Sequence, residues 1–147
     1  MTEPLRLTFD VRCSREHAFR VWTVNIAQWW PADHTVSGEP AAIVVEGLVG
    51  GRIFERTADG VVHEWGEVTT WDPPRHLGYQ WYLRQDRADA SQVDIIFTEQ
   101  GTSATRIEIE HHGWDRLGAK GPDRRRTNEA GWRGVLPHLI EACGGPA

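Results

Sequence analysis

The sequence predicts an α+β fold, in which a curved antiparallel sheet of about six or seven strands wraps around one long C-terminal helix. Near the end of the chain, residues 123–143 carry a single apolar stripe with helical spacing. Before them, most segments alternate apolar and polar residues with the period of a half-buried strand. Strands and long helices do not alternate along the chain, so antiparallel pairing is favoured over parallel βαβ units.

The composition is that of one globular domain, which we expect to cover residues 1–147. Hydrophobic residues make up 39% of the chain, enough for one core, and eight tryptophans indicate either an aromatic core or an apolar pocket. The net charge is −5, and the cluster of Arg124, Arg125 and Arg126 is too short to follow a phosphate backbone. No nucleic-acid partner is therefore expected.

The sequence also argues against membrane, metal and cofactor sites. No apolar stretch approaches the roughly 20 residues that span a bilayer, and no signal peptide is visible, so we expect a cytoplasmic protein. Cys13 and Cys143 lie far apart without Cys-x-x-Cys spacing, which favours reduced thiols over a disulfide or a metal site. Gly50-Gly51 lies between strands rather than between a strand and a helix, so no nucleotide cofactor is expected.

The first elements are a strand and two short helices. Leu5–Val11 alternates and forms the strand. Ser14 is suited to cap a short helix that ends near Thr23. Residues 25–30 predict one or two further helical turns, and the proline that follows ends them. Because adjacent residues on a helix diverge, we expect one of the two tryptophans at 29 and 30 to face the interior and the other to cover a rim.

Strands occupy the middle of the chain. Asp59-Gly60 predicts a hairpin turn, and Gly66 marks a bulge or a close approach of two backbones. The predicted strands are residues 42–46, 52–57, 61–71, 76–83, 93–97 and 105–111.

The long helix should pack on this sheet. Its apolar residues are separated by steps of three, one, three, one and three, and they are Trp132, Val135, Leu136, Leu139, Ile140 and Cys143. Gly131 and Gly134 flank Trp132, which indicates either a close approach of the helix to the sheet or space for a ligand beside the indole.

Several short motifs occur in an order that is typical of one family. They are Trp29-Trp30-Pro31, Gly50-Gly51-Arg52 leading into Phe54, Trp65-Gly66-Glu67-Val68 leading into Asp72-Pro73-Pro74-Arg75, Leu77 to Trp81, His111-His112-Gly113-Trp114 and Gly131-Trp132. In these motifs the chain resembles the bacterial Aha-type family of the START-like (SRPBCC) superfamily, homologous to the C-terminal domain of the activator of the heat-shock chaperone ATPase. The resemblance implies the helix-grip fold of the birch-pollen allergens and polyketide cyclases.

In that fold the concave sheet face and the long helix enclose a cavity. Residues that alternate inward, and aromatic residues near the mouth, are then candidates for binding an apolar or aromatic ligand. They are Trp29, Phe54, Tyr79, Trp81, Ile95, Phe97, Ile109, His111, Trp132 and Leu136. The alternative is that helix and sheet interdigitate and leave no cavity.

His111 is the most informative polar candidate, because it continues an inward set otherwise made of isoleucines. An unpaired buried polar group costs roughly 1–3 kcal/mol, so we expect a hydrogen-bond partner. A structural role, a ligand contact and a general base all fit this position. His112 should point outward, so the two histidines cannot share one metal ion.

Three functions follow, in order of preference. The first is binding of a small apolar or aromatic ligand without chemistry, since the inward set holds few ionisable groups. The second is a cyclase or aromatase in which His111 and Tyr79 transfer protons. The third, implied by the resemblance alone, is stimulation of a chaperone ATPase. The eukaryotic co-chaperones have a further N-terminal domain for chaperone contact, and one expected domain here leaves no room for it. A homodimer is left open.

Overall fold

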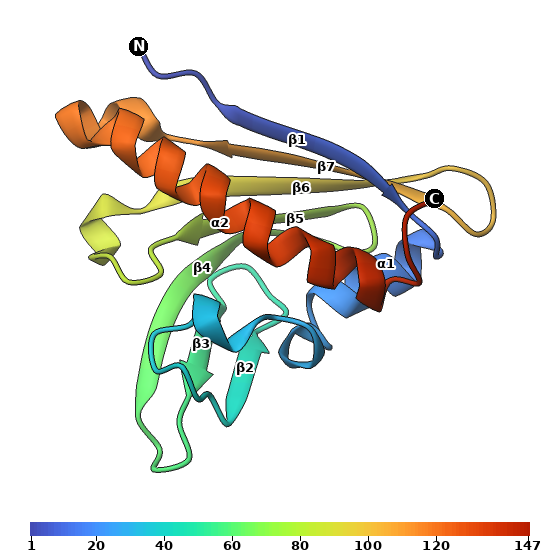
Figure 1. Cartoon of the computed structure of the whole chain (residues 1–147), viewed down its shortest axis with the longest axis horizontal. Coiled ribbons are helices and arrows are strands. Elements are labelled where there is room, and N and C mark those ends of the chain that lie inside the picture. The colour runs from blue at the N-terminus through green and yellow to red at the C-terminus, as the bar shows by residue number, and fades with distance from the viewer.

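One antiparallel sheet is the framework of the computed structural model, which describes residues 1–147 (Figure 1). Its seven strands lie in the order β1-β7-β6-β5-β4-β3-β2. Their bounds are β1 Leu5–Val11, β2 Ala42–Val45, β3 Arg52–Arg56, β4 Val62–Asp72, β5 His76–Trp81, β6 Ser91–Glu99 and β7 Thr105–His112. The predicted α+β class and curved antiparallel sheet are confirmed.

The inward alternation places equivalent residues of neighbouring strands side by side. Tyr79 of β5 is opposite Val93 of β6, which is opposite His111 of β7, which is opposite Leu5 of β1. All four are buried. The two-residue period of each strand therefore assembles one continuous apolar surface, interrupted by a single imidazole.

Helix α2, Gly121–Ala142, crosses the concave face of the sheet (Figure 1). Trp132, Val135, Leu136 and Leu139 are buried on it, as their spacing predicts. The helix begins two residues earlier than the 123 expected, because Pro122 fits the first helical turn. Short 3₁₀ helices, Arg87–Asp89 and Trp114–Lys120, lie in the connections from β5 to β6 and from β7 to α2.

The N-terminal helices cover one end of the core. In α1, Arg15–Trp22, the Ser14 hydroxyl accepts a hydrogen bond from the backbone N–H of His17 at 3.2 Å, so the predicted cap is present. Two 3₁₀ turns follow, Ile26–Gln28 and Ala32–His34.

Both tryptophans after the first 3₁₀ turn are buried, which differs from the expectation that one would cover a rim. The chain leaves helical geometry at Trp29, so the two indoles need not diverge. The Trp29 indole N–H donates to the Val21 carbonyl at 2.7 Å, and that of Trp30 donates to the His34 carbonyl at 3.0 Å.

Gly66 permits a close backbone approach within the sheet. A β-carbon there would lie 2.2 Å from the carbonyl oxygen of Gln80. The register of β3 against β4 also shifts between Ile53 and Phe54. β4 is bent along its length, and β3 and β2 curl away from the other strands (Figure 1).

A buried carboxylate, Glu55 of β3, ties this curled edge to the loop at residues 35–38. Its oxygens accept hydrogen bonds from the Ser37 hydroxyl at 2.6 Å, from the backbone N–H groups of Val36 and Ser37, and from the Trp65 indole at 2.8 Å. Burial acts to raise the pKa of Glu55, but these hydrogen bonds outweigh it and hold the pKa below the ordinary value. The sequence did not predict this group, because charged residues are rarely fully buried.

Among the helices, none combines the length and the apolar character that crossing a membrane requires.

Candidate ligand-binding site

A cavity of about 170 Å³ lies between the end of β5, the loop that follows it, and the first half of α2. Its wall combines aromatic and aliphatic side chains with a polar rim. The lining residues are Trp30, His34, Trp81, Tyr82, Leu83, Arg84, Gln85, Arg124, Thr127, Asn128, Gly131, Trp132 and Val135.

Three tryptophans form the apolar wall, and each is held by its element. Alternation along β5 points Trp81 inward, where its ring centroid lies 5.8 Å from that of Trp30. The helical stripe points Trp132 toward the sheet, and its indole N–H bonds to His111. Gly131 faces open space, since a β-carbon at this position would have no heavy atom within 4 Å. The absence of a side chain at 131 therefore preserves the space beside the Trp132 indole.

The rim is polar and carries positive charge. The Arg84 guanidinium donates to the Thr35 carbonyl, with its Nε at 3.0 Å, and the Arg84 backbone is in the left-handed region at φ 61°. The Arg124 guanidinium donates to the Asp89 carbonyl at 3.1 Å. Burial lowers the pKa of Arg124, partly offset by the nearby Asp89.

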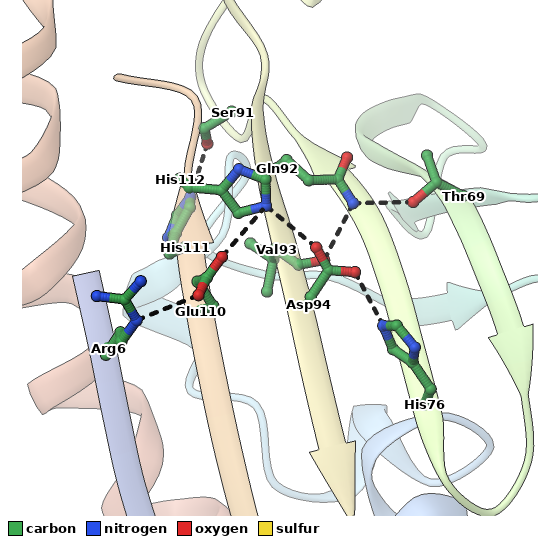
Figure 2. Close-up of polar contacts among 10 residues, drawn as sticks. All are labelled: Arg6, Thr69, His76, Ser91, Gln92, Val93, Asp94, Glu110, His111 and His112. Carbon is green, nitrogen blue, oxygen red and sulfur yellow. Dashed lines mark hydrogen bonds and ion pairs between the residues drawn. The ribbon is translucent and has the colours of Figure 1, made fainter. Parts of the chain in front are cut away.

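His111 is fully buried, and both of its ring nitrogens have protein partners. Figure 2 shows the contact with one of them, Ser91. The Trp132 indole N–H donates to Nδ1 at 3.0 Å, so Nδ1 carries no proton. Nε2 is then protonated and donates to the Ser91 hydroxyl at 2.6 Å. Burial, followed by the charges of His112 and Arg124, lowers the pKa of His111 to about 3. The imidazole is thus neutral and positions Trp132.

The predicted site residues divide into two groups. Trp81 and Trp132 line the cavity. Those that lie elsewhere are Trp29, Phe54, Tyr79, Ile95, Phe97, Ile109, His111 and Leu136.

The physical reason is that inward alternation does not distinguish a cavity wall from a packed core. Where β6 meets α1 the space is filled, for example by Phe97, whose ring centroid lies 5.2 Å from that of Phe19. Phe54 lies outside the main core cluster, with the Arg52 guanidinium 5.4 Å from its ring centroid. Phe54 therefore does not line this cavity, and its role in ligand binding stays a prediction.

The cavity residues that sequence analysis missed come mostly from loops and from the polar start of α2. Trp30 belongs to the tryptophan pair whose other member, Trp29, is the one we expect in the site from the sequence. Arg124 stands out in the sequence only as part of a basic cluster, without a role. His34 and Arg84 carry no local signal, because their positions depend on how two distant loops meet.

A separate polar cluster lies on the other face of the sheet, where His112 points outward as predicted (Figure 2). Asp94 bonds to His76 Nε2 at 2.9 Å and to His112 Nε2 at 3.1 Å. Burial acts to raise the pKa of Asp94, but the two histidine hydrogen bonds outweigh it and lower the pKa. No group of three or more His, Cys, Asp or Glu side chains is arranged to hold a metal ion.

The sequence matches the family of activator of Hsp90 ATPase homolog 1-like proteins over residues 12–144. The chain belongs to this family. The family that the motifs predicted is therefore confirmed, and with it the helix-grip fold of the START-like superfamily. A comparison with curated proteins finds none that matches.

Solved structures similar to this chain include an anthrahydroquino-γ-pyrone synthase, Txn09, at 29% identity and a TM-score of 0.64, covering 97% of this chain and 96% of that one. CalC, a self-sacrificing resistance protein from Micromonospora echinospora, is 26% identical with a TM-score of 0.71, covering 94% and 92%. The Aha1 dimer from Colwellia psychrerythraea is 16% identical with a TM-score of 0.69, covering 97% and 96%, and supports the fold alone.

Proposed function

We propose that this protein binds a small aromatic ligand in the cavity beside Trp30, Trp81 and Trp132. The observation that carries the proposal is a space of about 170 Å³ with three indoles in its wall. A cavity of about 150 Å³ is enough for a benzene ring. Aromatic rings in contact contribute roughly 0.5–1.5 kcal/mol beyond the burial of their area, so an aromatic ligand is favoured over an aliphatic one.

The similarity to one solved structure, Txn09, supports an aromatic ligand. Txn09 is named as the synthase of an anthrahydroquino-γ-pyrone, a name that describes fused aromatic rings, and it is similar to nearly the whole of this chain. The proposed ligand for this chain is an aromatic compound of the same broad class, of which one ring enters the cavity.

An enzyme of the cyclase or aromatase type is the second candidate, and its support is the same similarity to Txn09. The predicted acid–base pair does not suit it. Both ring nitrogens of His111 are hydrogen-bonded to protein side chains and are not free to transfer a proton to a ligand. Burial raises the pKa of the Tyr79 hydroxyl well above its ordinary value. The titratable group that suits it better is His34 in the cavity wall, whose Nδ1 bonds to Asp33 at 2.8 Å, an orientation typical of a general base. Turnover of an aromatic polyketone that is lost in His34→Gln would favour this candidate over binding alone.

Stimulation of a chaperone ATPase stays a prediction from family membership. A cytoplasmic location stays a prediction from the sequence, and a homodimer is a possibility that the similarity to the Aha1 dimer fits. An ATPase assay with the chaperone of the same cell tests the first, and stimulation at saturating protein is the result that would support it. Sedimentation analysis tests the homodimer.

Filling the cavity provides the direct test of ligand binding. Gly131→Leu should place a side chain in the open space beside Trp132 and abolish quenching of tryptophan fluorescence by a panel of one- and two-ring aromatic compounds. Ala130→Leu is the matched control, because Ala130 is an exposed neighbour on the same helix outside the lining. The proposal fails if no compound perturbs the wild-type tryptophans, or if Gly131→Leu binds as well as Ala130→Leu.

A further inference from the structure

We infer that the ligand carries a negatively charged group beside its aromatic part, and that Arg124 is the residue that binds this group. This inference rests on the proposed function and deepens it, because it specifies the charge of the ligand. It follows from the charges around the cavity, from the partial burial of Arg124, and from the fact that Arg124 forms no ion pair with a carboxylate.

The wall of the cavity contains two arginines and a histidine but no aspartate or glutamate. The chain as a whole has 21 acidic and 16 basic residues. The cavity lining, which has basic but no acidic side chains, therefore differs in sign from the net negative charge of the whole chain. Positive charge in a concave, partly apolar space attracts anions, because the low-dielectric walls concentrate the field.

Arg124 is incompletely neutralised although it is half-buried. Its hydrogen bond runs from Nη1 to a backbone carbonyl, that of Asp89, at 3.1 Å. The Asp89 carboxylate pairs instead with Lys120, at 3.7 Å. By contrast, Arg126 and Arg133 on the same helix each form an ion pair with an acidic side chain.

A guanidinium in this position has donors to offer. Arginine presents five N–H groups in a planar fork, which matches a carboxylate in two parallel hydrogen bonds. Burial already lowers the pKa of Arg124, which means that its charge has lost hydration. An anionic group of the ligand would replace the hydration that the Arg124 charge has lost, whereas a neutral group would not.

The other cation of the wall, Arg84, adds to the same field. Its guanidinium is fixed by the carbonyls of Thr35 and Asp33 and forms no ion pair with a carboxylate. Arg124 also lies near the N-terminal end of α2, where the helix dipole favours negative charge. The rim thus combines the guanidinium of Arg84 with that of Arg124, which comes from the first turns of α2, above a wall of tryptophans.

Cinnamate and cinnamyl alcohol provide the test, since they share one ring and a short tail and differ in charge. Binding to the full chain is measured by isothermal titration calorimetry at two salt concentrations. Wild type should bind cinnamate about tenfold more tightly than the alcohol, the effect of one charge-assisted hydrogen-bonded pair. Raising the salt concentration should weaken binding of cinnamate and leave the alcohol unchanged.

Variants assign the effect to Arg124. Arg124→Gln should bind the two probes equally, and Arg124→Lys should keep most of the preference because it keeps the charge. Arg133→Gln is the matched control, as it removes an exposed arginine of the same helix outside the lining. If Arg124→Gln does not fold, Arg124→Lys and the salt dependence of wild type still decide the matter.

The outcomes separate this inference from the proposed function. If the alcohol binds as tightly as cinnamate, or Arg124→Gln keeps the preference, the cavity stands as a ligand site but the assignment of charge is overturned. If neither probe binds, the cavity as a site for aromatic ligands fails and the inference fails with it.

Discussion

Replacing His111 by glutamine should remove a specific part of the pH dependence of folding. The neutral imidazole has one donor and one acceptor, which it uses toward Ser91 and Trp132. A glutamine amide also supplies a donor and an acceptor, but it does not titrate. Imperfect geometry should lower the free energy of unfolding by about 1–3 kcal/mol at neutral pH.

The pH-dependent part follows from the position of the pKa. In the folded protein the pKa of His111 is lowered from 6.5 to about 3, chiefly by burial. Between these values the unfolded chain binds a proton that the folded protein does not. The stability from the neutral imidazole is therefore fully present above pH 6.5 and is lost as the pH falls toward 3. The slope is about 1.4 kcal/mol per pH unit, so acidification from about pH 6.5 to 4.5 should cost about 2–3 kcal/mol.

Urea denaturation followed by tryptophan fluorescence at pH 7.5 and 4.5 measures this difference. Wild type should lose about 2–3 kcal/mol more than His111→Gln over this interval, since all other groups titrate in both proteins. His17→Gln serves as control, because it removes an exposed histidine, and it should behave as wild type. Equal losses in wild type and His111→Gln would refute the conclusion that His111 is held neutral in the core.

Three other features lead to measurable effects. Glu55→Gln should lower the free energy of unfolding by about 3 kcal/mol in urea, since charge-assisted hydrogen bonds from the 35–38 loop and Trp65 are lost; a change below about 0.5 kcal/mol, the usual effect of a surface substitution, would contradict the role of the carboxylate. Pro137→Ala should raise the thermal midpoint, because an exposed interior proline costs a helix up to about 3 kcal/mol; an unchanged or lower midpoint would show that the proline is accommodated. Burial raises the pKa of both Cys13 and Cys143, so Ellman's reagent should label the folded protein slowly and the denatured protein fast, and equal rates would count against this packing.

The sequence by itself determined the architecture, because the architecture depends on periodicity. Two-residue alternation gives inner and outer faces to each strand, and the spacing from Trp132 to Leu139 gives α2 its buried side. The same alternation predicted that His111 points inward and His112 outward. The cost of leaving a buried polar group unpaired then predicted that His111 has a hydrogen-bond partner. The motifs, taken in order, identified the family.

Only the tertiary structure decided which part of the inward surface is open. Periodicity predicts that a side chain points inward. Whether it then contacts another side chain or faces a cavity depends on the side-chain volumes contributed by the sheet and by the helix. The cavity lies beside Gly131, and its rim combines His34 and Arg84 from loops about fifty residues apart with Arg124 from the helix. Sequence spacing cannot predict that such residues lie close together, because the paths of loops depend on long-range contacts such as those of Glu55 with the 35–38 loop. For the same reason, the partners of His111 and the incomplete neutralisation of Arg124 are evident only in the folded chain.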